Sequence, residues 1–415
     1  MKFIADFHLH SKYSRATSRD MDLESLDKWA KIKGIKVLGT ADFTHPEWFK
    51  NLKEKLEPAE SGLFKLKKID SGTRFILTTE ISCIYSKNQR VRRIHILIFA
   101  PSFEVVEKIN TQLGWVGNIK SDGRPILGLD AKELAKIVFS ASKDCMVIPC
   151  HAWTPWFSIF GSKSGFDSIE ECFEEYTKHI FAIETGLSSD PPMNWRLSAL
   201  DNITLLSNSD SHSPSKIGRE ANVFDIDLSY PAIVKAIKEK DPSKLLYTIE
   251  FFPEEGKYHY DGHRSCDVNI SPKESKKYNN VCPKCGKPLT IGVLNRVEEL
   301  ADREIDSKPK NAIPFKSLIP LNEIIAEAVG TLPGSKKVRE EYEKTISKFG
   351  NEFQILLNAS AEELKESLLP EIAQGILQVR EGKVNIVPGY DGVYGKIKIF
   401  SKGEEKSPEK QKTLF

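Results

Sequence analysis

Short β-rich runs alternate with amphipathic helical stretches from residue 1 to about residue 250. The runs predicted as strands are KFIADF, KVLGTAD, RFILTTEI, IHILIFA, CMVIPC, FAIETG and ITLLSNSD. The helices predicted between them include MDLESLDKWAKIKG, AKELAKIVFSAS, FDSIEECFEEYTKHI and YPAIVKAIKEK. This alternation is typical of βα units around a parallel sheet, so we expect an α/β fold. Seven such strands could close into a barrel, which we favour over an open doubly wound sheet.

The rest of the chain changes character twice. Residues 251–300 are rich in turn formers and poor in long periodic segments, which indicates a small metal-stapled module. We expect a mainly helical domain over 301–400 that ends in a short β segment, VNIVPGYDGVYGKIKIF. Residues 401–415 have the polar, charged composition of a disordered tail.

Side chains that bind metals recur where the predicted strands end. His8 and His10 lie two residues apart in ADFHLHS and would point to the same side of an extended strand. The other candidates at or within strands are Asp42, Glu80, His95, His151, Asp210 and His212. Any one of these histidines is explained as readily by a core or surface position. Together, on strand ends that converge on one face of the fold, they predict a multinuclear metal site.

These motifs resemble those of the PHP (polymerase and histidinol phosphatase) domain. The shared pattern is HxH after the first strand, then TxD, an isolated Glu, two histidines and a closing SDxH. The resemblance implies a distorted seven-stranded (β/α) barrel that holds two to three divalent ions and hydrolyses phosphoesters. It assigns metal ligation to His8, His10, Glu80, His95, His151, Asp210 and His212.

Two positions of the PHP pattern each have two candidate residues in this chain. The acid that follows the first motif corresponds to Asp20, although Asp22 is close. Phe43 stands where the family has a histidine, so either Asp42 or the displaced His45 fills that coordination place.

The predicted ligands suggest a mechanism. Two ions about 3.5–4 Å apart can clamp the attacking and leaving oxygens of a phosphoryl displacement. Metal coordination also lowers the pKa of a bound water towards neutrality. We expect Glu80, Asp210 and His151 to be the catalytic ligands, with the two carboxylates bridging ions. A nitrogen-rich set suits zinc, iron or manganese better than magnesium alone. We expect zinc, with manganese or magnesium as alternatives.

A second metal site is predicted in the turn-rich segment. His263, Cys266, Cys282 and Cys285 form the pattern HxxC-x15-CxxC, which is typical of one structural zinc ion in tetrahedral coordination. His259 could replace His263. The alternative is that the cysteines are free thiols beside a surface histidine.

A closer resemblance is to the endonuclease Q family of archaeal and bacterial PHP nucleases. The segments that carry it are TGLSSDPPMNWRLSALD, SNSDSHSPSKIGREAN, KYHYDGHRSC, CPKCGKPLTIGV and PGYDGVYGKIKIF. The likeness implies hydrolysis of double- and single-stranded DNA on the 5′ side of hypoxanthine, xanthine, uracil or an abasic site. The rival functions are a PHP phosphatase acting on a small phosphomonoester and a noncatalytic DNA-binding scaffold.

Aromatic, basic and terminal residues are the candidates for contacts with DNA and partners. The aromatic residues Trp153, Trp156 and Phe157 follow His151 and could stack on an extruded base, although core packing explains them equally. Arg219 could contact a phosphate or form an ion pair. The terminal QKTLF resembles an archaeal sliding-clamp (PCNA) peptide anchored by Gln411, Leu414 and Phe415, unless it is merely a chain end.

Net charge and the distribution of apolar residues indicate how the chain could contact DNA and where in the cell we expect it. With 60 basic and 58 acidic residues the net charge is +2, so any DNA contact must come from a local basic surface. No apolar run approaches the ~20 residues that cross a bilayer, and the N-terminus lacks a signal-peptide pattern. We therefore expect a cytoplasmic, nucleoid-associated protein without a membrane partner.

Overall fold

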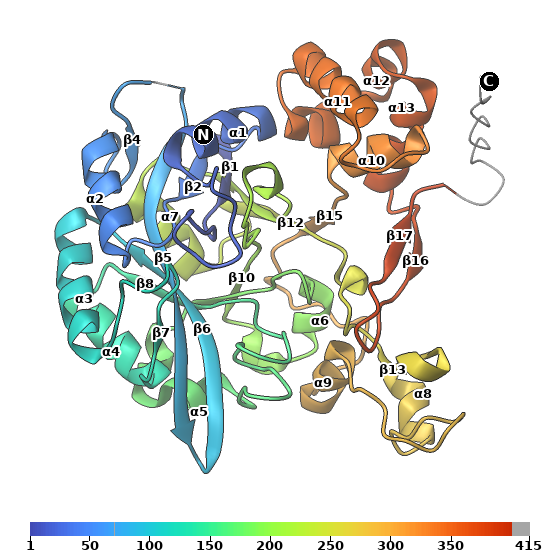
Figure 1. Cartoon of the computed structure of the whole chain (residues 1–415), viewed down its shortest axis with the longest axis horizontal. Coiled ribbons are helices and arrows are strands. Elements are labelled where there is room, and N and C mark those ends of the chain that lie inside the picture. The colour runs from blue at the N-terminus through green and yellow to red at the C-terminus, as the bar shows by residue number, and fades with distance from the viewer. Residues whose placement is uncertain (70, 401–415) are drawn as a thin grey trace, which may run out of the picture.

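The computed structural model describes residues 1–69 and 71–400. Its centre is a mixed β-sheet with strand order β15-β12-β11-β1-β2-β5-β4-β3, in which β6 pairs with β5 and β8, and β7 pairs with β5 (Figure 1). These strands are β1 (Lys2–Asp6), β2 (Val37–Gly39), β3 (Leu56–Pro58), β4 (Phe64–Leu66), β5 (Arg74–Lys87), β6 (Arg90–Ala100), β7 (Ile126–Leu127), β8 (Met146–Pro149), β11 (Ala221–Asp225), β12 (Leu245–Glu250) and β15 (Phe315–Ser317). A separate parallel pair is formed by β9 (Ala182–Glu184) and β10 (Thr204–Leu206).

Every run predicted as a strand is a strand, and the α/β class is confirmed. The expectation of an all-parallel sheet is wrong, because β5 and β6 form an antiparallel hairpin. Lys87 pairs with Arg90 across the two-residue turn Asn88-Gln89, and both turn residues have positive φ. A turn of this kind returns the chain directly and removes the need for a helical crossover.

Helices surround these strands in residues 1–250, which we call the N-terminal region (Figure 1). They are α1 (Leu23–Lys33), α2 (Pro46–Lys55), α3 (Phe103–Val116), α4 (Ala131–Ala141), α5 (Ile169–Phe173), α6 (Pro191–Trp195) and α7 (Tyr230–Glu239). α1 shows how the sequence specifies them: the side chain of Asp22 caps its first turn, and Leu23, Leu26 and Ala30 are buried on one face. The stretch predicted as one helix over 166–180 divides into α5 and the 3-10 helix η1 (Glu174–His179).

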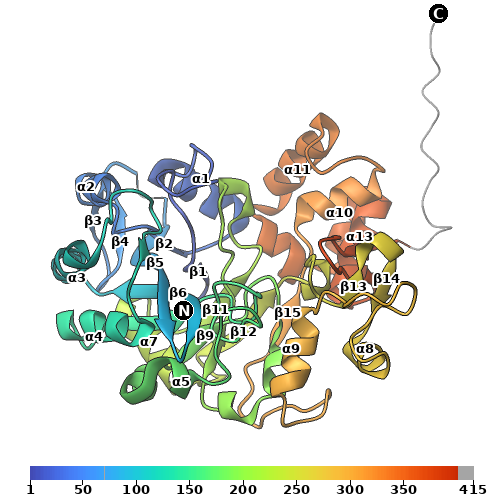
Figure 2. The same cartoon turned by 60° about the horizontal axis from the view of Figure 1, so that its bottom comes forward.

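Residues 251–300, which we call the Cys-His module, contain β13 (Asp261–His263), β14 (Val268–Ile270), α8 (Pro272–Lys277) and α9 (Val293–Leu300). The remainder contains α10 (Leu321–Ala328), α11 (Lys336–Phe349), α12 (Ala361–Ser367), α13 (Pro370–Arg380), β16 (Asn385–Val387) and β17 (Lys396–Lys398). Figure 2 shows α10, α11 and α13 gathered at one side of the N-terminal region.

Both later parts attach firmly to the N-terminal region. β15 adds to the edge of the main sheet, parallel to β12. Arg296 of α9 donates to the carbonyl oxygens of Phe160 and Phe166. A buried ion pair joins Lys33 of α1 to Glu352, with 2.7 Å between Nζ and Oε2. Among the described residues, no helix has both the length and the apolar character needed to cross a membrane.

Candidate metal centre and its relatives

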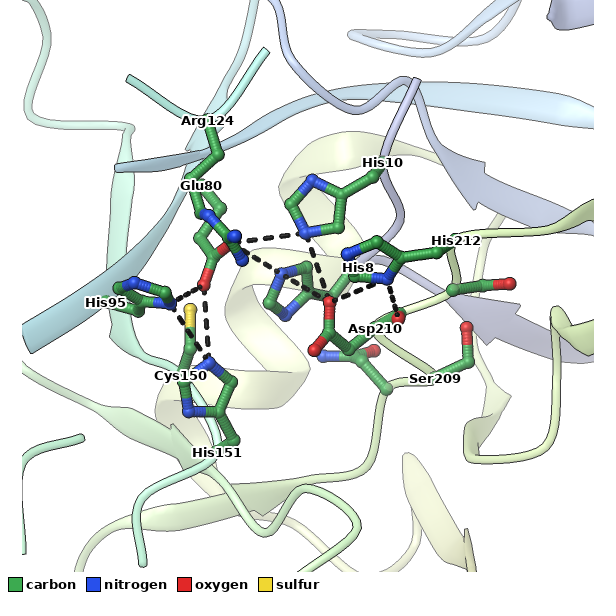
Figure 3. Close-up of polar contacts among 12 residues, drawn as sticks. His8, His10, Glu80, His95, Arg124, Cys150, His151, Ser209, Asp210 and His212 are labelled. Atoms are coloured by element: carbon green, nitrogen blue, oxygen red, sulfur yellow. Dashed lines mark hydrogen bonds and ion pairs between the residues drawn. The ribbon is translucent and has the colours of Figure 1, made fainter. Parts of the chain in front are cut away.

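Four side chains from distant parts of the chain meet within the N-terminal region (Figure 3). His8 and His10 follow β1, Glu80 lies in β5 and Asp210 follows β10, and their ligand atoms lie within 4.8 Å of one another. His10 Nε2 is 3.2 Å from Glu80 Oε2 and 3.1 Å from Asp210 Oδ1. His8 and His10 are fully buried, whereas the Asp210 side chain is 29% exposed.

The chemistry of this group fits a divalent ion. His8 Nε2, His10 Nε2 and Asp210 Oδ1 are buried without a partner in hydrogen-bond geometry. Such buried polar atoms are costly unless a ligand satisfies them. Imidazole nitrogens together with carboxylate oxygens suit zinc or manganese.

A second group shares Glu80 with the first. The Oε1 atom of Glu80 lies 2.6 Å from His95 Nδ1 and 3.3 Å from His151 Nε2. Its other oxygen, Oε2, faces the first group and accepts a hydrogen bond from Arg124 at 3.1 Å. Burial alone would favour the neutral acid, but the neighbouring His95 and Arg124 hold the pKa of Glu80 well below its usual value. Glu80 is therefore available to both groups as an ionised carboxylate.

Three candidate residues, in the loops after β2, β8 and β10, have a left-handed backbone conformation. Asp42, His151 and Asp210 have φ values of 41°, 30° and 46°. A left-handed conformation is uncommon outside glycine and costs energy, so such residues gather at functional sites.

Glu184, which sequence reasoning missed, holds His8 in place. Its Oε2 atom lies 2.9 Å from His8 Nδ1 and accepts from the backbone N–H of His151 at 3.2 Å, while Asn208 donates to Oε1 at 2.8 Å. Because a carboxylate only accepts hydrogen bonds, Nδ1 of His8 carries the proton and Nε2 is left for a metal. The sequence signal that could have identified Glu184 is its position at the end of the strand FAIETG. Cys150 completes a further group with His8 and Glu184.

Other predicted ligands lie at the margin. The His212 ring is 4.5 Å from the His10 ring, and its Nδ1 lies 2.9 Å from the Asp210 carbonyl oxygen. Asp42 accepts hydrogen bonds from Ser11 and Ser14, and its Oδ1 lies 3.3 Å from His10 Nδ1. Asp42 therefore supports His10 rather than joining the first group.

The structure does not bring two alternatives to the centre. His45 stacks on Tyr13, with ring centroids 4.4 Å apart. Asp20 is exposed on the loop before α1, so the expectation that it is a ligand is not supported by its position. Asp22, the other option, is used as the cap of α1.

The Cys-His module has its own candidate metal site. His263, Cys266, Cys282 and Cys285 place their ligand atoms within 4.8 Å of one another, and three thiols with one imidazole are a ligand set typical of structural zinc. Burial opposes ionisation of Cys282, but the backbone N–H groups of Lys284 and Cys285 outweigh it and lower its pKa to about 7. His259 is absent from this group, because it is buried elsewhere and stacks on Tyr260.

The residues predicted to touch DNA differ in their exposure. Trp153 is a core residue, 1% exposed, whose Nε1 donates to Asn194 at 2.8 Å, so its proposed role in base stacking is wrong. Trp156 is 48% exposed, and Phe157 packs on the His95 ring. Arg219 donates to the carbonyl oxygen of Ser209. The predicted clamp residues Gln411, Leu414 and Phe415 lie outside the described residues.

Comparison with known proteins decides the family. The MJ0043 C-terminal domain family matches residues 320–383. The MJ0043 protein of Methanocaldococcus jannaschii is 39% identical over 255 residues, which is 60% of this chain but 31% of that protein. This chain therefore spans about a third of that relative's length. The lesion-specific endonuclease PfuEndoQ of Pyrococcus furiosus is 34% identical, with a TM-score of 0.86 over 96% of this chain and 95% of its own. The chain belongs to the endonuclease Q family.

A second endonuclease Q structure extends the match. It is 33% identical, has a TM-score of 0.84 and covers 99% of both chains. That relative was solved in complex with a 27-mer duplex substrate carrying an abasic lesion at the active site. Because both endonuclease Q matches cover nearly the whole chain, they include the Cys-His module and the C-terminal helices. This chain is thus an enzyme of the endonuclease Q family along almost its full length.

Proposed function

We propose that this chain is a metal-dependent DNA endonuclease that cuts on the 5′ side of deaminated bases and abasic sites. The bases concerned are hypoxanthine, xanthine and uracil. The observation that carries the proposal is that the two oxygens of Glu80 face two separate groups of imidazoles, in a chain that belongs to the endonuclease Q family. The relative solved with an abasic duplex supports DNA as the substrate.

The proposed chemistry divides between ions and side chains. Divalent ions bound by the two groups would polarise the phosphate and supply an activated water. The residues that would hold them are His8, His10, Glu80, Asp210, His95 and His151. The partly exposed Asp210 places one edge of this set within reach of a substrate from solvent.

Three neighbours support these ligands. Glu184 keeps the Nε2 atom of His8 directed towards the centre, and Asp42 does the same for His10. Arg124 helps to keep Glu80 ionised, and its own side chain is 27% exposed. We also propose that the N-terminal region is a PHP-type barrel and that the Cys-His module holds one structural zinc ion. The C-terminal tail would bind PCNA, and the protein would work in the cytoplasm, associated with the nucleoid.

The test is nicking of end-labelled duplexes, each with one defined lesion, after metal removal and after addition of zinc, manganese or magnesium. We expect one cut, 5′ of the lesion, that requires added metal and is absent from undamaged duplex. Rapid hydrolysis of p-nitrophenyl phosphate without nicking of any lesion duplex would replace the proposal with a small-molecule phosphatase.

A further inference from the structure

One loop carries two candidate residues of the metal centre. Residues 207–220, which we call the ligand loop, connect β10 to β11 and contain Asp210 and His212. Figure 3 shows both side chains beside His10. A metal site functions only if its ligands are held within ~0.5 Å of the productive geometry. The contacts that fix the ligand loop therefore also fix part of the metal centre.

A buried carboxylate ties the two ends of the ligand loop together. Asp6, the last residue of β1, is fully buried. Its Oδ1 atom accepts a hydrogen bond from the backbone N–H of Ser209 at 3.0 Å, and its Oδ2 atom accepts one from the backbone N–H of Gly218 at 2.9 Å. Ser209 directly precedes Asp210. A displacement of Gly218 would therefore reach Asp210 through one side chain.

The C-terminal helices contact this loop at Gly218. Gly218 has a φ of 71°, and a Cβ at this position would lie 2.8 Å from Ile35 Cδ1 and 3.2 Å from Phe353 Cε2. The backbone of the loop thus packs directly on the ring of Phe353, which is 4% exposed. Removal of that ring would leave a cavity into which the ligand loop could move.

The neighbouring Glu352 fixes Phe353 in relation to α1, which faces the C-terminal helices in Figure 1. Glu352 is 3% exposed, and its Oε2 atom lies 2.7 Å from Nζ of Lys33. It also accepts hydrogen bonds from the Tyr342 hydroxyl at 2.5 Å and from the backbone N–H of Leu321 at 3.1 Å. A buried carboxylate with all its partners in place holds α1, α10 and α11 in one arrangement.

A second contact between the ligand loop and the C-terminal helices lies at the surface. Lys216 of the loop forms an ion pair with Glu323 of α10, with 2.9 Å between Nζ and Oε1. The two side chains are 41% and 27% exposed. Solvent screens a pair of this kind, so it holds the loop less firmly than the buried contact with Phe353. It can, however, be changed without disturbing the core.

We propose that the C-terminal helices position the metal centre, and that Phe353 is a positioning residue for Asp210 and His212. Phe353 acts through the backbone of Gly218, and the surface ion pair between the ligand loop and α10 assists it. In the described part of the chain, no group of candidate ligands includes a residue of these helices, so they act without touching an ion. The inference rests on the proposed function only in taking the centre to hold divalent ions.

The experiment measures binding of Mn²⁺ to the full chain after dialysis against a chelator, by electron paramagnetic resonance, so it does not depend on nicking. The Asp210→Asn variant identifies the binding that belongs to the centre, because that binding should be lost. Phe353→Ala should weaken the Mn²⁺ affinity of the centre about tenfold. Phe353→Leu keeps most of the contact with Gly218 and should restore most of the affinity.

The matched control is Leu364→Ala, which removes a fully buried side chain from α12, a helix that packs on α13. Both alanine variants leave a cavity, so urea unfolding should show a loss of stability in each. The Mn²⁺ affinity of Leu364→Ala should nevertheless equal that of the original chain. An affinity of Phe353→Ala equal to that of Leu364→Ala would overturn the proposal.

The surface ion pair provides a second test, which decides the matter if Phe353→Ala does not fold. Charge alone would move Lys216→Gln and Glu323→Gln in opposite directions, because loss of a cation favours Mn²⁺ and loss of an anion disfavours it. Loss of positioning instead weakens the Mn²⁺ affinity in both, by about threefold, with no further loss in the double variant. Unchanged affinities, or affinities that move in opposite directions, would overturn the proposal.

Nicking of a lesion duplex, measured in parallel, separates this proposal from the proposed function. Normal Mn²⁺ affinity in Phe353→Ala, together with metal-dependent nicking, would remove the positioning role and leave the proposed function intact. Mn²⁺ affinity that depends on Phe353, in a protein that nicks no lesion duplex, would overturn the proposed function and leave the positioning role standing.

Discussion

The two candidate metal sites of this chain are built in opposite ways. The centre of the N-terminal region collects imidazoles and carboxylates from strands and from the loops after them, up to 202 residues apart between His8 and Asp210. The Cys-His module takes three thiols and one imidazole from residues 263–285, with Cys285 exposed. Three thiolates and one imidazole complete the tetrahedral coordination of a structural zinc ion. Carboxylates shared between ions would leave coordination positions open for a substrate. The first arrangement suits reaction and the second suits structure.

The largest effect on nicking should follow from a change in a ligand of the N-terminal metal centre. Asp210→Asn removes a negative oxygen without changing shape, so nicking should fall by at least about 10³-fold. Duplex binding and the zinc content of the module should persist. Single-turnover nicking, anisotropy and metal analysis measure these three properties. Residual nicking within tenfold of the original would show that the ligand assignment is wrong.

A change in the module should produce the complementary result. Cys282→Ser removes a thiolate ligand, so the protein should lose one equivalent of zinc and bind duplex about tenfold more weakly. The centre should keep its metal, because none of its ligands comes from the module. Zinc content by mass spectrometry and duplex binding give the answer. A full complement of zinc in the variant would refute the module site.

A change at Glu184 tests whether a residue that positions a metal ligand affects metal affinity and nicking as the ligands themselves do. Glu184→Gln weakens the acceptor for His8 and places an amide N–H group against the donors of His151 or Asn208. Metal affinity of the centre and nicking should each fall about 10–100-fold. Titration with manganese, followed by nicking, measures both. The exposed control Glu366→Gln should change neither, and a Glu184→Gln variant equal to it would exclude a positioning role.

The smallest effect concerns a buried carboxyl that binds no metal. Glu250 accepts hydrogen bonds from Thr185 and Thr248, and burial raises its pKa to about 7. A raised pKa in the folded state means that stability is complete below the ordinary carboxyl pKa and is lost as pH rises through 7. Glu250→Gln stays neutral, so its stability relative to the original should rise between pH 5 and pH 8 by on the order of 2 kcal/mol. Urea unfolding at both pH values measures this, and a difference independent of pH would contradict it.

The two sites also differ in how far sequence alone could predict them. The module site was predictable because four ligands lie within 263–285, where spacing alone indicates zinc. The centre was predictable in outline because polar residues at strand ends converge. Its supporting residues were not: Glu184 follows the same rule but carries no motif, and Arg124 lies on a loop whose path depends on tertiary packing. The β5–β6 hairpin escaped notice because Asn88-Gln89 is a weaker turn signal than Asn-Gly.

The central claim is that the imidazoles and carboxylates of the N-terminal region hold ions together. Anomalous diffraction from crystals grown with zinc or manganese tests it most directly, because the module provides an internal control in the same map. We predict at least two peaks beside Glu80, within bonding distance of His8, His10, His95 and His151, and one peak among the module cysteines. A strong module peak with no density beside Glu80, and with the imidazoles turned apart, would contradict the account.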